Sequence, residues 1–183
     1  MRAALLGLIA LAALISFAPS LGKVLGIELT TASESAPSLS EVETGFCKDS
    51  GIAVVVDFGA ESGRETQVRC VDSQGATGWE LLELATQQVM GTAQYPIGFV
   101  CRIDDWPSSK EQDCKDTPRP AEGTWAYYFA TPEAGDNWMF SGQGSASRKP
   151  GCGSVEGWRF VSPAETGTNL MPRLDPQTLS CRK

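Results

Sequence analysis

The chain contains no histidine in its 183 residues. This absence excludes the serine–histidine–aspartate and cysteine–histidine catalytic arrangements, and it removes the commonest protein ligand of metal ions. No C-x-x-C spacing occurs among the cysteines either, so a zinc site built from thiolates is not expected. Any hydrolytic chemistry would have to rely on carboxylates or lysine.

A long apolar run is also absent beyond the N-terminus. Residues 3–17 form an apolar run without a charge, which follows Arg2 and precedes Ala18, Pro19 and Ser20. This pattern is typical of a secretory signal, and the run is shorter than the roughly 20 apolar residues that a membrane-spanning helix needs. We therefore expect residues 1–20 to be a signal peptide and the mature chain to leave the membrane, with a retained anchor as the alternative.

Positive charge is scarce, since 15 Lys and Arg residues stand against 22 Asp and Glu residues, for a formal net charge of -7. Nucleic acids and anionic membranes are bound through cationic patches that release counterions. The basic pair Arg148 and Lys149 is isolated in the sequence. We therefore expect neither a nucleic-acid nor an anionic-lipid partner.

Six cysteines follow the predicted signal, and an even number in an exported chain indicates three disulfides. Because short loops close at a lower entropic cost, pairing between neighbours is favoured over the other possible pairings. The favoured pairs are Cys47 with Cys70, Cys101 with Cys114, and Cys152 with Cys181.

The middle of the chain shows strand and helix signals after a polar stretch. Residues 21–45 are rich in small polar residues and predict a flexible linker, so the domain should begin at residue 46. The β-branched run 52–58 and the alternating run 65–70 predict a β-hairpin. Thr77 and Glu80 have the spacing of a capping box, which predicts a helix over residues 81–90 that ends at Gly91.

Further strands are predicted after that helix, over residues 97–103, 125–131, 137–141 and 155–161, with a polar loop at 106–120. One helix among several strands predicts an α+β fold in which the helix lies across a small mixed or antiparallel sheet, as in a β-grasp. The domain would span residues 46–161. Residues 162–183 would form a C-terminal tail tied back through Cys181.

Acidic residues gather after the third predicted strand, but their arrangement does not indicate catalysis. Asp104 and Asp105 are adjacent, so in an extended segment their side chains diverge. A calcium site that adds Asp113 and Asp116 is the alternative to a solvated strand end. We expect no catalytic residue, metal or cofactor.

Aromatic residues are the most distinctive feature, with five tryptophans in a small domain. Trp106 lies beside a proline in a polar loop, which predicts an exposed ring, and exposed tryptophans often anchor binding surfaces. Trp125 and Tyr127 share one face of an alternating strand. The candidate ligand contacts are Trp106, Trp125, Tyr127 and Trp158.

Four of these segments together resemble the transcobalamin C-terminal-like domain. They are IAVVVDF at 52–58, GATGWELLELA at 75–85, GFVCRIDDWP at 98–107 and GTWAYYFA at 123–130. The resemblance implies a β-grasp-like fold that binds a soluble ligand or a partner without catalysis, and cobalamin is the ligand of the vertebrate carriers. This chain lacks the large helical domain that holds the corrinoid from the other side in those carriers.

The sequence thus predicts a secreted, monomeric, non-enzymatic binding module of the cell envelope or the extracellular space. Its partner would be a small molecule, such as a corrinoid, or an extracellular or envelope protein. The alternative is a secreted protease inhibitor, because small exported inhibitors of subtilisin-like proteases also combine an early strand that ends in cysteine with one helix. Such an inhibitor would present the loop bounded by Cys101 and Cys114.

Overall fold

The computed structural model describes residues 40–41, 47, 51–167 and 170–179, all of which belong to one unit that spans 35–183. The predicted signal at 1–20, most of the predicted linker and Cys181 lie outside the described residues. Within the described ranges, no helix is long and apolar enough to cross a membrane.

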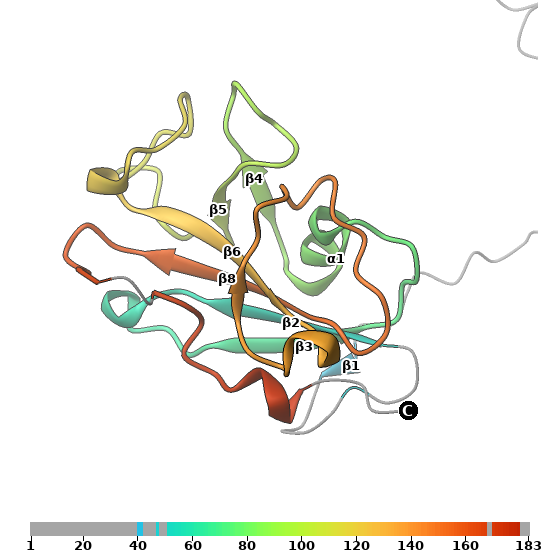
Figure 1. Cartoon of the computed structure of the whole chain (residues 1–183). Coiled ribbons are helices and arrows are strands. Elements are labelled where there is room, and N and C mark those ends of the chain that lie inside the picture. Colours follow the sequence, from blue (N-terminus) through green and yellow to red (C-terminus); the bar gives the residue numbers. More distant parts are fainter. Residues whose placement is uncertain (1–39, 42–46, 48–50, 168–169, 180–183) are drawn as a thin grey trace, which may run out of the picture. The chain divides into compact units, whose positions relative to one another are not determined.

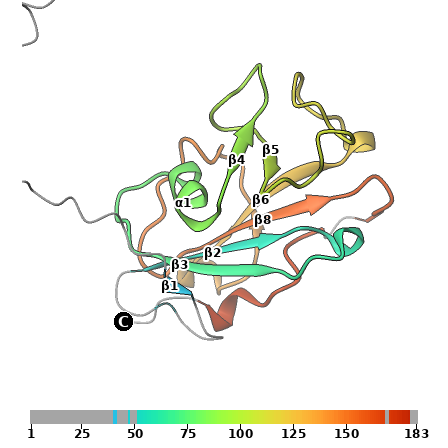
Figure 2. The same cartoon turned by 180° about the vertical axis from the view of Figure 1, so that it is seen from behind.

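These residues form an α+β fold with a single α-helix, α1, at Gly78–Ala85 (Figures 1 and 2). Short 3-10 helices lie at Ala60–Ser62, Pro120–Glu122, Pro132–Ala134 and Pro176–Thr178. The strands are β1 (Ser40–Glu41), β2 (Ile52–Asp57), β3 (Gln67–Val71), β4 (Val89–Gly91), β5 (Val100–Ile103), β6 (Thr124–Ala130), β7 (Met139–Phe140) and β8 (Val155–Val161).

Six strands form one mixed sheet in the order β1-β3-β2-β8-β6-β7, while β4 and β5 form a separate two-stranded ribbon. The central strands β2 and β8 are parallel, and the other pairs of the sheet are antiparallel. The predicted mixed sheet with one helix is therefore confirmed, as are the β2–β3 and β6–β7 hairpins. β1 lies within the predicted linker at 21–45 and pairs with β3.

The start of the helix agrees with the prediction, but its end does not. The Oγ1 of Thr77 accepts the Glu80 N–H at 3.3 Å, and the Glu80 carboxylate accepts the Thr77 N–H at 2.7 Å, which is the predicted capping box. The helix then ends at Ala85, and Val89–Gly91 forms β4 instead of a last helical turn.

Asp104 explains this early end. Its Oδ1 accepts the backbone N–H groups of Gln87 and Gln88 at 2.8 and 2.9 Å, and its own N–H donates to the carbonyl of Gln88 at 3.0 Å. These bonds replace the intrahelical bonds that the two residues would otherwise make. Because Asp104 is distant in sequence, the local pattern of residues 81–90 gives no sign of it.

The core has two parts because both faces of the sheet are covered. On the face toward α1, Ile52, Val54 and Val56 of β2 join one buried cluster with Trp79, Leu81 and Leu82. On the other face, Ala53 and Val55 join a second cluster with Leu179 of the C-terminal tail. Each buried aliphatic side chain contributes about 1.5–3 kcal/mol, so the tail is an integral part of the fold.

Two of the three predicted disulfides are confirmed. Cys47 is bonded to Cys70 and Cys101 to Cys114, with Cα–Cα distances of 5.6 and 5.7 Å. The third predicted pair includes Cys181, which lies outside the described residues. Cys152 packs against the same cluster as Leu179, two residues before Cys181.

Candidate functional site

Two of the four predicted contact aromatics are buried in the core. Trp125 is 7% exposed and Trp158 is 1% exposed, and both belong to the cluster on the helix side of the sheet. Trp125 lies edge-on to Phe160, and Trp158 stacks on Tyr127 with ring centroids 4.6 Å apart. Both rings, which the sequence predicted as ligand contacts, therefore lie in the core.

Tyr127 packs against the same buried cluster. Its hydroxyl donates to the buried carboxylate of Glu156. Burial raises the pKa of Tyr127, and the neighbouring Glu156 charge adds to this effect, so the hydroxyl stays protonated at physiological pH. Strand alternation correctly placed Tyr127 on the face of Trp125, but both rings point toward the core.

Trp106 is half-buried and not exposed as predicted. Asp104 and Asp105 have φ values of 46° and 62° and form a tight turn, across which Ile103 and Trp106 exchange two backbone hydrogen bonds of 2.9 Å. This turn folds the chain back, so that the indole packs edge-on against Phe160. A polar loop sequence cannot reveal such a reversal.

Two of the acidic residues of this region, Asp104 and Asp113, are engaged within the protein. Asp104 accepts the two N–H groups after α1, and Asp113 pairs with Lys115 at 3.0 Å. Among the described residues, no group of three or more Asp, Glu or Cys side chains could hold a metal ion.

The loop closed by Cys101 and Cys114 is folded into a turn. The Gln112 N–H donates to the Ser108 carbonyl at 3.0 Å, and the Glu111 carboxylate accepts both the N–H and the hydroxyl of Ser108. Inhibitors that mimic a substrate present an extended segment that pairs with the protease backbone. Residues 108–112 form a turn and not an extended segment of this kind.

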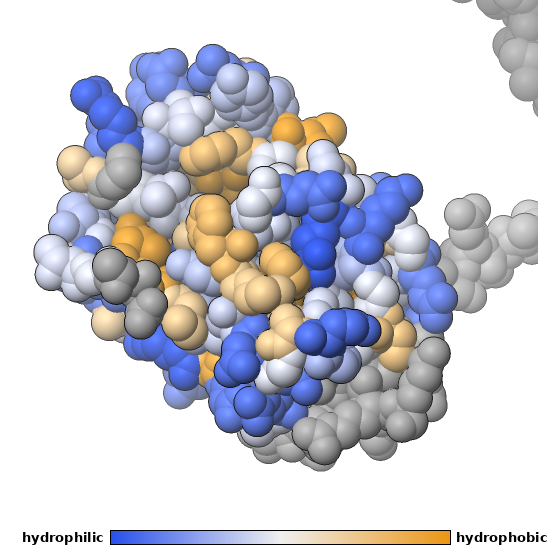
Figure 3. Space-filling view, in the orientation of Figure 1, coloured by the Kyte–Doolittle hydropathy of each residue, from blue (hydrophilic) through white to orange (hydrophobic). Residues whose placement is uncertain are grey.

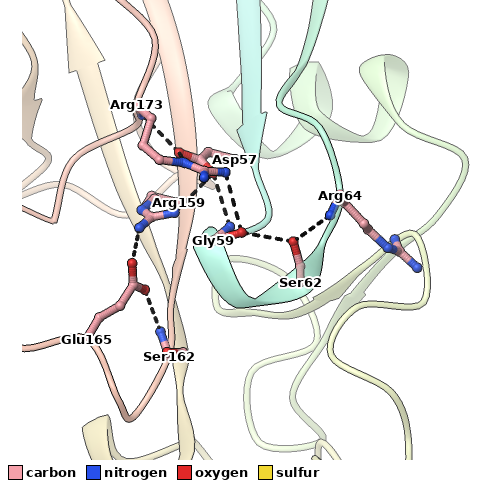
Figure 4. A network of polar contacts seen from close by, with 8 residues as sticks. All are labelled: Asp57, Gly59, Ser62, Arg64, Arg159, Ser162, Glu165 and Arg173. Atoms are coloured by element: carbon pink, nitrogen blue, oxygen red, sulfur yellow. Dashed lines mark hydrogen bonds and ion pairs between the residues drawn. The ribbon is translucent and has the colours of Figure 1, made fainter.

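A buried network fastens the C-terminal tail to the end of β2 (Figure 4). Asp57 is fully buried, and its carboxylate accepts hydrogen bonds from Arg173 at 2.7 Å, Arg159 at 3.0 Å and the Gly59 N–H at 3.0 Å. Burial alone would raise the pKa of Asp57, but the bonds from Arg173 and Gly59 and the charge of Arg159 hold it below its usual value. Arg159 also pairs with Glu165. The network binds elements of the fold to one another and is structural.

The exposed apolar side chains lie elsewhere, on two segments that carry no charge. No charged residue occurs between Glu83 and Arg102, and none between Asp136 and Arg148. Five large apolar side chains of these segments are exposed. One of them, Met90 (37% exposed), lies against the guanidinium of Arg102, 3.5 Å from its sulfur. We call the other four and their segments the uncharged surface. They are Tyr95 (51% exposed), Ile97 (68%), Met139 (36%) and Phe140 (67%).

The two segments come together in space. A Cβ atom on Gly98 would lie 3.2 Å from the Cβ of Ala146, so the β4–β5 loop touches the loop that follows β7. Both views of the ribbon show this second loop beside the β4–β5 ribbon (Figures 1 and 2). In Figure 3, apolar residues gather near the middle of the face, where β7 and the start of this loop lie.

The β4–β5 half of the surface is held firmly. The Ala93 N–H donates to the carbonyl of Cys114 at 2.8 Å, and the Tyr95 N–H donates to the Thr92 hydroxyl at 2.9 Å. The chain folds back so closely that a Cβ on Gly91 would collide with the carbonyl oxygen of Pro96. Tyr95 and Ile97 are therefore exposed on a loop that is already ordered.

Two polar hollows are lined by other residues. One, of about 350 Å³, is lined by Gln87, Gln88, Asp104 and Asp105. Another, of about 380 Å³, is lined by residues between 109 and 122. Neither hollow is lined by Tyr95, Ile97, Met139 or Phe140, although Gln87 and Gln88 of the first hollow belong to the first uncharged segment.

No protein-family model matches the chain, and neither a curated protein nor a solved structure matches it. The function is therefore inferred from the side chains themselves. The sequence signal that indicates the uncharged surface is its two charge-free stretches, because such stretches are unusual in a chain with 20% charged residues.

Proposed function

We propose that the protein is a non-enzymatic binding module that takes up an uncharged, amphipathic ligand or partner on its uncharged surface. One observation carries the proposal: two charge-free segments, far apart in the sequence, meet and expose the four large apolar side chains of that surface. The cores of binding interfaces are poor in charge and rich in aromatic residues and methionine. The side chains of this surface have that composition.

The chemistry of the surface sets the class of ligand. With no cation on either segment, it offers no ion pair to a ligand with a net negative charge, whereas its rings suit apolar groups and its Ser, Thr and Gln residues suit hydrogen bonding. Burial of one aromatic or aliphatic side chain contributes about 1.5–3 kcal/mol. Binding should therefore change little with salt, since no ion pair is screened.

The order of the elements supports a β-grasp-like domain similar to the transcobalamin C-terminal-like family. A hairpin, one helix and a last strand that returns parallel to the first in the middle of the sheet are the features of that fold. Within this proposal, cobalamin and related corrinoids are the first ligands to test. An uncharged apolar face of an envelope protein is the second kind of partner.

We also propose that the protein works as a monomer in an oxidising compartment outside the cytoplasm. The two disulfides support this location, because such bonds persist where the thiol pool is oxidised. The predicted signal at residues 1–20 is consistent with export.

The test is an NMR titration of the isotope-labelled mature protein with cobalamin, cobinamide and a set of uncharged amphipathic compounds. We expect a binding compound to shift amide resonances within residues 92–98 and 139–147. Phe140→Ser should weaken its affinity about tenfold or more, because about 1.4 kcal/mol of lost contact corresponds to a tenfold change. The measured affinity should be nearly the same at low and high salt.

Met171→Ser is the matched control. Met171 is 36% exposed, as is Met139, but it lies on the C-terminal tail. Met139→Ser should weaken binding and Met171→Ser should not. Shifts centred on residues 104–113, or equal effects of the two substitutions, would show that the ligand binds elsewhere.

A further inference from the structure

The second half of the uncharged surface has no regular structure of its own. After β7 the chain runs through residues 141–154, which include four glycines, before it enters β8. A glycine-rich loop has many conformations in solution, so ordering it costs conformational entropy. The loop must therefore be held by specific contacts if Phe140 and its neighbours are to form a preformed surface.

Two backbone bonds seat the loop on the start of α1. The Gly78 N–H donates to the carbonyl of Arg148 at 2.8 Å, and the Trp79 N–H donates to the carbonyl of Ser145 at 3.0 Å. The first N–H groups of a helix have no partner within the helix. Here the loop supplies both acceptors, and these two amides report directly on whether the loop is seated.

The side chain of Arg148 fastens the same loop to the sheet. Its Nε and Nη2 each donate to the Glu156 carboxylate at 3.2 Å, and its Nη2 also donates to the Ser154 hydroxyl at 3.2 Å. Its guanidinium carbon lies 3.8 Å from the centre of the Phe129 ring, a cation–π contact. One residue thus links the loop to α1, β6 and β8.

The burial of Glu156 strengthens its ion pair with Arg148. The side chain is fully buried on β8 and also accepts hydrogen bonds from Ser154 and Tyr127. Burial raises the pKa of Glu156, against the hydrogen bonds from Ser154, Tyr127 and Arg148, which lower it. Arg148 is the one cation among its described contacts, and removing one partner of a buried pair leaves the other uncompensated.

We propose that Arg148 is the positioning residue of the uncharged surface: it locks the loop at 141–148 onto α1 and β8, so that the surface is formed before a ligand arrives. This proposal rests on the proposed function only in one respect, namely that the side chains that the loop exposes form a binding surface. A preformed surface avoids the cost of ordering the loop on binding.

Amide hydrogen exchange of the mature protein without any ligand tests this role. In Arg148→Gln, we expect the amides of Gly78 and Trp79 to exchange about tenfold faster or more, because charge-assisted hydrogen bonds of the loop are lost. Amides in the middle of β2 should lose less protection than those of Gly78 and Trp79, because they do not depend on the seating of the loop. Unchanged exchange at Gly78 and Trp79 would overturn the proposal.

Lys149→Gln is the matched control, because it removes the same charge from the next residue, whose side chain is exposed. It should leave both amides protected, and equal acceleration in the two variants would also overturn the proposal. If Arg148→Gln does not fold, Arg148→Lys decides the question. Lysine keeps the charge but has no planar fork, so it should give intermediate exchange, and wild-type exchange would count against the proposal.

Cobalamin binding, measured on the same variants, separates the two proposals. Faster exchange together with weaker cobalamin binding supports both. Faster exchange with unchanged cobalamin affinity leaves the role of Arg148 in seating the loop intact and refutes the uncharged surface as the cobalamin site. Weaker binding without faster exchange refutes the positioning role.

Discussion

Replacing Asp57 by asparagine should destabilise the domain strongly at neutral pH. The carboxylate is fully buried and is contacted by Arg159, whose side chain is 4% exposed, and by both the side chain and the N–H of Arg173. Breaking a buried ion pair from one side costs about 3–5 kcal/mol. The amide of asparagine removes the charge and turns an N–H group toward the guanidinium groups. We therefore expect the free energy of unfolding to fall by an amount in this range.

The pH dependence of this loss has a defined sign. Because the pKa of Asp57 is lower in the folded protein than in the unfolded chain, its contribution is fully present above the unfolded pKa of about 3.9 and is lost as the pH falls through the folded pKa. The difference in free energy of unfolding between the wild type and Asp57→Asn should be constant near pH 6–7. It should shrink below a pH of about 4.

Urea denaturation at several pH values, followed by circular dichroism, measures this difference. With an m-value of about 1–3 kcal/mol/M, the loss lowers the midpoint by about 1 M or more. Asp113→Asn is the control, because Asp113 pairs with Lys115 on the surface and its removal should leave the midpoint unchanged. A wild-type midpoint for Asp57→Asn at pH 7, or a difference that grows on acidification, would refute the reasoning.

Two further predictions concern the tail and the cysteines. Gly157→Ala should lower the free energy of unfolding by about 1–3 kcal/mol, because the new Cβ would lie 2.7 Å from the Trp138 ring and 3.0 Å from Pro172. Urea denaturation measures this loss, and a wild-type midpoint would show that the two groups move aside at no cost. Peptide mapping without reduction should find Cys47 linked to Cys70, Cys101 to Cys114, and Cys152 to Cys181. The third link is expected because Cys152 packs against the cluster that contains Leu179, and a Cys152 peptide that can be alkylated would contradict it.

The sequence predicted most of the strands because their signals are local. The β-branched run of β2 and the alternation of β6 need no distant partner to be recognised, and the capping box of Thr77 and Glu80 marked the start of α1. The end of α1 could not be predicted, since it depends on Asp104 from another part of the chain.

The candidate site was harder to predict, because exposure is a property of the whole fold. The sequence pointed to tryptophans, yet Trp125 and Trp158 fill the interior and Trp106 is turned back onto it by the tight turn at Asp104 and Asp105. Phe140 drew no attention in the sequence, but it lies on the two-residue strand β7 at the sheet edge and is 67% exposed. The largest rings are therefore the more buried ones, and the smaller ring of Phe140 is the better candidate for a ligand contact.

The two halves of the uncharged surface are held by different chemistry, and this ties the surface to its compartment. The β4–β5 loop depends on the carbonyl of Cys114, whose position is fixed by the disulfide with Cys101, whereas the loop at 141–148 depends on Arg148 and Glu156. Reduction would loosen only the first half, and loss of the ion pair only the second. A ligand that contacts both halves therefore needs an oxidised domain with an intact pair, and the proposed surface would form fully only where the disulfide persists.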